Sequence, residues 1–186
     1  MAAACGCLKQ GARMLFNKKI SVSIVLAILL VNLLIPFAKS YSQENIESLV
    51  GSQFNQELNC LAENIYYESA SESYEGKLAV AQVTLNRANS GKFPPTVCGV
   101  VHQKDNIKGT MICQFSWVCM AVKAPFRNKY LWEESLRAAR TALTEPVAHL
   151  MIYASNALYY HAAYVDPGWH LKQVARIGNH VFYKGT

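Results

Sequence analysis

The stretch CLAENIYYESASESYEG, residues 60–76, is the most informative part of the sequence, because helical spacing places a glutamate on an apolar face. Residues 57–67 have helical spacing, with Leu61 and Ile65 on one side. Glu68 follows Leu61 by seven residues and Ile65 by three, so a continued helix puts its carboxylate on the same stripe. Burial disfavours the charged form and raises the pKa of a carboxyl group, as a general acid near neutral pH requires. The alternative is a helix-terminal glutamate that turns towards solvent.

Two further glutamates, Glu72 and Glu75, follow within two helical turns. Neighbouring carboxylates are the acid and base of many glycosidases. Here the local pattern also has structural explanations, because Ser69-x-x-Glu72 matches a capping box and Glu75 suits a helix N-terminus. We favour these structural roles, with Glu72 supporting the site.

Downstream, the chain predicts helices first and strands last. Ser73 is a candidate N-cap for a helix that ends before Gly91-Lys92-Phe93-Pro94-Pro95. Residues 96–103 suit a short helix or strand, and 104–110 a polar loop. Residues 130–143 form an amphipathic helix whose expected core face is Leu131, Leu136, Ala139 and Leu143. Aromatic and β-branched residues at 157–161 and 174–183 predict strands, with a turn at Gly178-Asn179. The fold class is therefore α+β: a mainly helical domain with a small late β-sheet or hairpin.

The amino terminus predicts export. Residues 20–38 contain no charge and follow Lys18 and Lys19, a pattern typical of a secretory signal peptide. An uncleaved signal anchor is the alternative. We therefore divide the chain into residues 1–40 as signal peptide or anchor, 41–56 as linker, and 57–186 as the folded domain, which lies outside the cytoplasm.

The basic charge belongs to this leader. The formal charge is +6, yet residues 1–40 hold five basic residues and no acidic one, which leaves 13 basic against 12 acidic residues beyond them. The remainder is close to neutral, so nucleic acid is not an expected partner.

Four cysteines lie beyond the leader: Cys60, Cys98, Cys113 and Cys119. An even number in an exported domain predicts two disulfides, with three connectivities open. The spacing lacks a CxxC pair, and His149, His170 and His180 have no ligand spacing, so we expect no metal.

Residues 60–76 and a series of later motifs resemble SleB-like spore-cortex-lytic and related cell-wall hydrolases. The later motifs are Ala79-Val-Ala81, Leu85-Asn-Arg87, Phe93-Pro94, Thr96-Val-Cys-Gly-Val-Val101, Cys113-Gln-Phe-Ser-Trp117, Tyr160-His-Ala162, Trp169 and Ile177-Gly-Asn-His-Val-Phe182. The resemblance runs from about Asn59 to Tyr183, and the order and spacing of the motifs are its specific feature.

This resemblance implies a lysozyme-like fold and lytic transglycosylase activity on peptidoglycan. In the family, the first glutamate of a Gly-Glu-Ala-Arg-Gly-Glu element is catalytic, and it aligns with Glu68. Here Tyr67, Ser69, Ala70 and Ser71 replace the Gly, Ala, Arg and Gly of that element, while both glutamates are retained.

The expected substrate is the glycan strand, and no cofactor is expected. Gln114 and Ser116 are candidate donors to sugar groups; Tyr159, Tyr160 and Trp169 are candidate stacking rings, and His161 a candidate cleft residue. Membrane contact is expected only through an uncleaved leader, in the periplasm or cell envelope.

Three other functions stay open on the sequence. A hydrolytic muramidase or glucosaminidase would need a second carboxylate across the cleft. A cysteine peptidase or amidase would use Cys113 and His161, and a glycan-binding module would need no catalytic residue.

Overall fold

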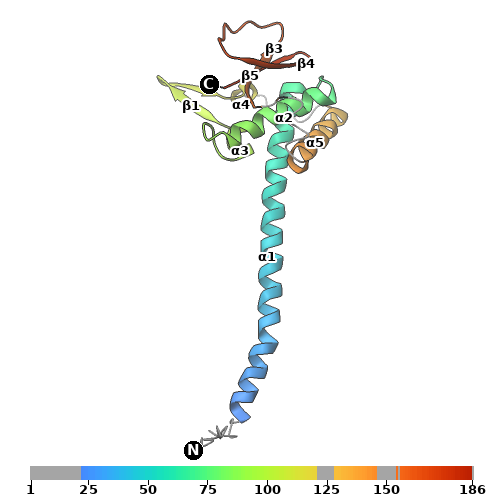
Figure 1. The fold of residues 1–186 in the computed structure, drawn as a ribbon, viewed down its shortest axis with the longest axis vertical. Helices are drawn as coiled ribbons and strands as arrows, with labels where there is room; N and C mark the ends of the chain where they lie inside the picture. The colour runs from blue at the N-terminus through green and yellow to red at the C-terminus, as the bar shows by residue number, and fades with distance from the viewer. Residues whose placement is uncertain (1–21, 121–127, 146–153, 155, 186) are drawn as a thin grey trace, which may run out of the picture. The chain divides into compact units, whose positions relative to one another are not determined.

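The computed structural model describes residues 22–120, 128–145, 154 and 156–185 (Figure 1). The chain divides into two compact units, residues 1–48 and 49–186. Helix α1 (Val22–Ser69) supplies the described residues of the first unit and the beginning of the second.

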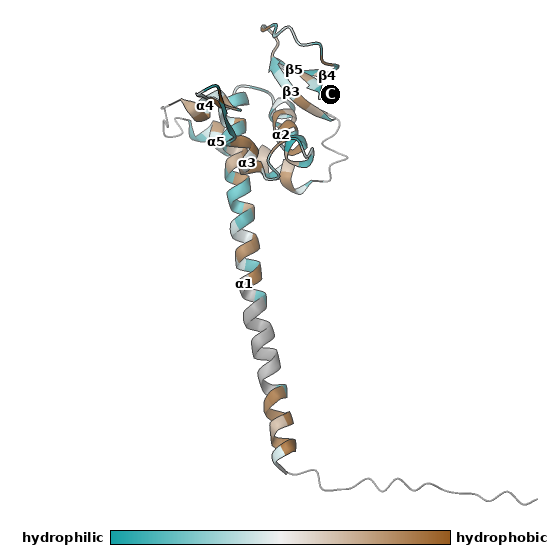
Figure 2. Cartoon of the chain, turned by 90° about the vertical axis from the view of Figure 1, so that its left-hand side faces the viewer, coloured by the Kyte–Doolittle hydropathy of each residue, from teal (hydrophilic) through white to brown (hydrophobic). Residues whose placement is uncertain are grey.

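In the first unit, the beginning of α1 is apolar and exposed. Its large side chains between Ile24 and Val31 are about half exposed, and Figure 2 shows them as hydrophobic. Within the described part of the chain, no helix combines the length and apolar character needed to cross a membrane. Residues 20 and 21 of the apolar run lie outside the described residues, and the leader stays a prediction. Residues 41–56, expected as a linker or short helix, are helical within α1.

Helix α2 (Tyr74–Asn89) begins where the sequence predicts. The Ser73 side chain accepts a hydrogen bond from the Gly76 backbone N–H at 3.2 Å. Glu75 lies exposed in the first turn, where hydrogen bonds from its own backbone N–H and from Ser73 lower the pKa of its carboxyl group. Both structural predictions for this helix start are confirmed.

Helix α5 (Lys129–Thr144) lies beside α2 (Figure 1), and its buried side chains are small. The expected helix is confirmed, but its predicted core face is only partly right. Leu131, Leu136 and Leu143 are half-buried, while the buried face is Ser135, Ala138, Ala139 and Ala142. Small residues let two helix backbones approach closely, which moves the leucines to the edges of the contact.

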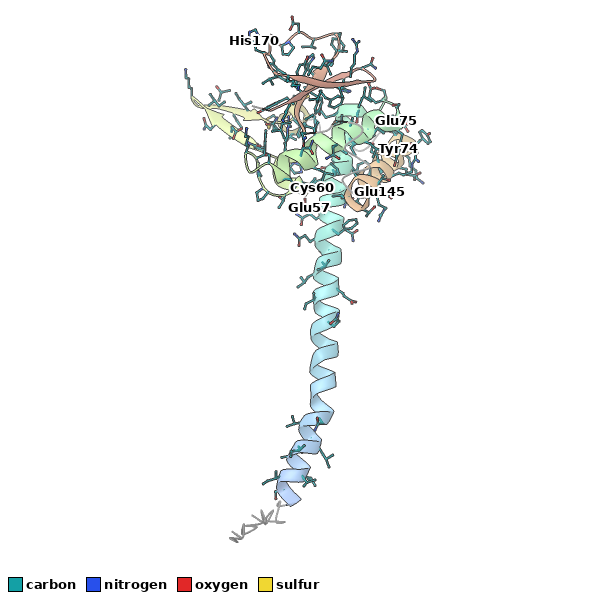
Figure 3. The ribbon with its side chains drawn as sticks, viewed as in Figure 1. Glu57, Cys60, Tyr74, Glu75, Glu145 and His170 are labelled. Carbon is teal, nitrogen blue, oxygen red and sulfur yellow. A yellow bond between two sulfur atoms is a disulfide. The ribbon has the colours of Figure 1, made fainter. Side chains whose placement is uncertain are left out.

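The short helix α3 (Val97–Val101) is tied to α1. One Glu57 oxygen accepts from the backbone N–H groups of Val97 at 2.6 Å and Cys98 at 3.2 Å, and Cys60 forms a disulfide with Cys98. Figure 3 labels Glu57 and Cys60 on α1. A carboxylate at a helix N-terminus is favourable because it faces unpaired N–H groups.

Residues 104–110, expected as a polar loop, instead belong to a hairpin of β1 (Lys104–Ile107) and β2 (Thr110–Cys113). Its two turn residues, Lys108 and Gly109, have φ of 52° and 85°. Two consecutive positive φ values match the strand twist, which makes this a favoured hairpin turn. Every β1 residue is exposed, so no alternation of apolar residues revealed the strand.

The late strands form an antiparallel sheet in the order β3-β5-β4, from β3 (Ala157–Ala162), β4 (Gln173–Ile177) and β5 (His180–Lys184). Gly178, with φ of 55°, begins the predicted turn between β4 and β5. Helix α2 contacts α5 and also this sheet, so it lies in both hydrophobic cores. The mainly helical α+β prediction is confirmed.

Candidate active site

A pocket of about 490 Å³ opens where the end of α1, helix α2 and strand β3 meet. Its described lining is Glu68, Arg87, Cys113, Gln114, Phe115, Ser116, Tyr159, Tyr160 and Trp169. Among these residues Glu68 is the only acid. The pocket therefore assembles one carboxyl group, one guanidinium and several aromatic rings from segments far apart in the sequence.

Glu68 lies one residue before the end of α1, half-buried, beyond the fully buried Leu61 and Ile65. The Tyr160 hydroxyl donates to Glu68 Oε2 at 3.1 Å. Burial raises the pKa of the Glu68 carboxyl group, while the Tyr160 hydrogen bond and the Arg87 charge oppose part of that rise. Of the two alternatives that the helical spacing left open, the half-buried position favours the apolar face over a side chain turned to solvent, and a carboxyl group with a raised pKa is suited to hold a proton for transfer.

The Tyr160 hydroxyl donates a hydrogen bond to the Glu68 carboxyl group. Burial and the neighbouring Glu68 charge raise the pKa of its hydroxyl well above the ordinary value. The hydroxyl therefore stays protonated, and it can hydrogen-bond Glu68 in both protonation states of the acid.

Arg87, on α2, lines the pocket but was not among the predicted site residues. Its side chain is buried, Nε donates to the Leu158 carbonyl at 2.7 Å, and its guanidinium lies 5.1 Å from the Phe93 ring centre and 5.4 Å from that of Phe115. The available sequence signal was the Leu85-Asn-Arg87 motif of the family resemblance, which named the residue without a role. Its partner carbonyl comes 71 residues later, so no local pattern showed the pairing.

The pocket lining contains five of the six candidate substrate-contact residues: Gln114, Ser116, Tyr159, Tyr160 and Trp169. His161 is the exception, because it lies beside the pocket and not in its lining. Its Nε2 is 2.9 Å from the Tyr183 hydroxyl, and its ring centre is 5.6 Å from that of Trp169. His161 therefore adjoins the pocket lining at the Trp169 ring.

Glu72 lies outside the pocket and links the start of α2 to the β4–β5 turn. Its Oε2 accepts from the Asn179 backbone N–H at 3.1 Å, and its Oε1 from Asn179 Nδ2 at 3.0 Å. Nδ1 of the buried His180 is 4.0 Å from Oε1. The predicted capping box is wrong, since the Ser69 hydroxyl donates back to the Ile65 carbonyl at 3.0 Å. The Glu72 carboxylate lies against the β4–β5 turn because the backbone N–H and the side-chain amide of Asn179 both donate hydrogen bonds to it there.

All four predicted cysteines are in disulfides, Cys60 with Cys98 and Cys113 with Cys119. Cys113 therefore has no free thiolate, which removes the nucleophile of the cysteine peptidase alternative. No group of metal-binding side chains is found within the described ranges.

Comparisons with known proteins place the chain in a protein family. Residues 71–183 match the sequence model of the family described as Cell Wall Hydrolase. The spore cortex-lytic enzyme of Oceanobacillus iheyensis is 30% identical over 131 residues, which are 69% of this chain and 41% of that enzyme. That of Bacillus subtilis is 28% identical over 149 residues, 78% of this chain and 43% of that enzyme. The chain thus spans about two fifths of the length of these curated relatives.

A solved structure is also similar. The catalytic domain of the germination-specific lytic transglycosylase SleB from Bacillus anthracis aligns with a TM-score of 0.50 at 30% identity, covering 69% of this chain and 93% of that domain. The family resemblance expected from the sequence motifs is confirmed. The family match includes Glu72, Arg87 and Trp169 but begins after Glu68, so the catalytic role of Glu68 stays a prediction.

Proposed function

The chain belongs to the cell wall hydrolase family, and from that premise we propose that it cleaves peptidoglycan glycan strands as a lytic transglycosylase with Glu68 as its acid and base. The similar SleB domain carries the name of that activity. The observation that carries the proposal is the pocket itself, in which the single acid among the described lining residues has a raised pKa and a hydrogen bond from Tyr160.

The first step uses the protonated form of Glu68. Its carboxyl group gives its proton to the oxygen that bridges N-acetylmuramic acid and N-acetylglucosamine, and the bond from that oxygen to muramyl C1 breaks. The N-acetylglucosamine hydroxyl leaves with the proton. Glu68 is then a carboxylate, and positive charge develops at muramyl C1.

The second step returns the proton. The Glu68 carboxylate takes the proton of the muramyl C6 hydroxyl, whose oxygen bonds to C1 and closes a 1,6-anhydro ring. Glu68 ends protonated, so one carboxyl group completes the cycle and no water is consumed. This balance matches a pocket in which one acid is described.

Substrate contacts are assigned to the walls of the pocket. We assign sugar hydrogen bonds to Gln114 and Ser116 and ring stacking to Tyr159, with the partly exposed Trp169 at the rim. His161 supports the Trp169 ring from outside the pocket. Glu72 supports the site by holding the turn between β4 and β5, and β5 pairs with the strand that carries Tyr160.

The test is mass spectrometry of soluble products after incubating residues 41–186 with purified peptidoglycan. We expect muropeptides ending in 1,6-anhydro-N-acetylmuramic acid from the wild type and none from Glu68→Gln. Glu75→Gln is the matched control, because Glu75 is exposed and lies outside the pocket.

Other products would assign another function. Reducing-end sugars would indicate the hydrolytic muramidase or glucosaminidase, and free stem peptides an amidase. Binding without any product, unchanged in Glu68→Gln, would indicate a glycan-binding module. Activity retained by Glu68→Gln would move the acid to another residue.

A further inference from the structure

Arg87 is a buried cation in the wall of the proposed catalytic pocket. Its side chain is 4% exposed and is held in place on one side by the Leu158 carbonyl, 2.7 Å from Nε. The rings of Phe93, Phe115 and Tyr159 surround the guanidinium, with centres 5.1, 5.4 and 5.9 Å from Cζ. Such contacts favour a planar cation, so the charge is fixed in position.

One donor of this guanidinium is unused. Nη1 is buried and has no hydrogen-bond partner among the described residues. A buried donor without a partner is costly, and native proteins leave few of them. In the wall of a substrate pocket, an unused donor is suited to an acceptor that is present only when substrate is bound or during reaction.

In the proposed reaction, Glu68 in the same pocket lining acquires a full negative charge when it gives up its proton. The Arg87 charge lowers the pKa of Glu68 against the effect of burial, and the Glu68 charge in turn raises the pKa of Arg87 against the same effect. The other titratable groups that act on Arg87 are the hydroxyls of Tyr159 and Tyr160, both on β3. While Glu68 is protonated, Arg87 faces no full negative charge from these groups.

On the proposed function, we infer that Arg87 is a positioning residue whose fixed charge stabilises the Glu68 carboxylate between the two proton transfers. The charge pairing then strengthens when the proton leaves Glu68 and weakens when it returns. An interaction that is stronger in the charged intermediate than in the resting enzyme lowers the barrier to the first transfer. The Tyr160 hydroxyl on β3 donates a hydrogen bond to the same carboxyl group, so it acts on Glu68 together with the charge of Arg87 on α2.

The test is a pH–rate profile of anhydro-muropeptide release by the wild type, Arg87→Gln and Arg87→Lys. We expect Arg87→Gln to lower kcat by about 100-fold with a smaller change in KM. Its alkaline limb moves to higher pH by about one unit or more, because removing a nearby cation raises the pKa of Glu68. Arg87→Lys keeps the charge and the wild-type limb. Arg140→Gln, on the exposed face of α5, is the control and leaves the profile unchanged.

A merely structural role would lower activity at every pH without moving the limb, and that result overturns the inference. If Arg87→Gln does not fold, NMR of the wild type decides. The ¹⁵Nε signal of Arg87 is expected to follow the titration of Glu68 and to lose that step in Glu68→Gln; a signal indifferent to Glu68 overturns the inference. A wild type that releases no anhydro product at any pH contradicts the proposed function instead, so the two failures are distinguishable.

Discussion

Glu68 is a residue whose position works against the stability of the fold at neutral pH. Burial raises the pKa of its carboxyl group above the ordinary 4.5, so the folded protein holds this proton more tightly than the unfolded chain does. The stability that the proton supplies is complete below the unfolded pKa and is lost as pH rises through the folded pKa. A neutral side chain of the same shape avoids that loss.

We therefore expect Glu68→Gln to have a higher melting temperature than the wild type above the folded pKa of Glu68. The difference shrinks as pH falls towards 4, where the wild-type carboxyl group is protonated. Thermal unfolding from pH 4 to 8 measures it, with Glu75→Gln as the control. Glu75 has a lowered pKa, so neutralising it has the opposite sign or no effect. If Glu68→Gln became less stable than the wild type as pH rises, the expected cost of the buried Glu68 charge would be contradicted.

The backbone conformation of Gly178 and its close approach to Glu72 lead to a second prediction. Its φ is 55°, and a Cβ at this position would collide with Oε2 of Glu72, which Asn179 holds in place. We expect Gly178→Ala to cost about 3 kcal/mol in the free energy of unfolding. Gly109→Ala is the matched control, because φ is 85° and nothing lies near its Cβ, so only the backbone cost of about 1 kcal/mol remains. Equal losses in urea unfolding would show that the Glu72 contact contributes nothing.

The sequence could predict which residues belong to the site more readily than the contacts that fix them, because several of those contacts join distant segments. The spacing from Leu61 predicted the burial of Glu68. Arg87 depends on a carbonyl in β3, which no helical pattern reveals. His161, a candidate cleft residue, is not in the described pocket lining, because its side chain forms a hydrogen bond with the Tyr183 hydroxyl on the neighbouring strand.

At the scale of elements, the two disulfides close loops of very different length. Cys60 and Cys98 are 38 residues apart and join α1 to α3, whereas Cys113 and Cys119 are 6 apart and enclose pocket residues 114–116. Loop-closure entropy therefore predicts a loss of about 4 kcal/mol for Cys60→Ser/Cys98→Ser and about 2 kcal/mol for Cys113→Ser/Cys119→Ser.

Activity is expected to follow the opposite order. Below the melting temperature of both variants, loss of Cys113–Cys119 lowers the rate more, because it frees the segment that carries Gln114 and Ser116. Urea unfolding and the muropeptide assay on the same preparations compare the two effects. Rates that simply follow stability would indicate that the short disulfide does not position the pocket.

Elements were predictable where their pattern was amphipathic or capped. The Ser73 cap and the strands after residue 156 follow from local chemistry. The hairpin of β1 and β2 was missed because both strands are largely exposed, and exposure removes the alternation that marks a strand. The Lys108-Gly109 turn was the remaining signal. On α5, the size of the leucines led to the prediction that they form the core face. The buried residues are mainly alanines instead, because α2 approaches closely, and the sequence of α5 alone does not reveal that partner helix.

In the whole molecule, the distribution of basic residues and the positions of the disulfides both separate residues 1–40 from the rest of the chain. The five basic residues of positions 1–40 precede a remainder with 13 basic and 12 acidic residues, and both disulfides belong to that remainder. Disulfides persist in oxidising compartments, and peptidoglycan lies outside the cytoplasmic membrane. We therefore propose export for residues 41–186, with residues 20–38 as the apolar part of the signal.

Fusing residues 1–48 to a phosphatase that is active only after its own disulfides form tests this proposal. The fusion is expected to be active on the outer side of the membrane. Leu29→Arg/Leu30→Arg should abolish that activity, since each arginine in the middle of an inserting segment costs about 3 kcal/mol. Intact mass of the exported fusion then separates cleavage after Ser40 from an uncleaved anchor. If the two fusions are equally active, the apolar run does not direct export, and the disulfides of the domain must form by another route.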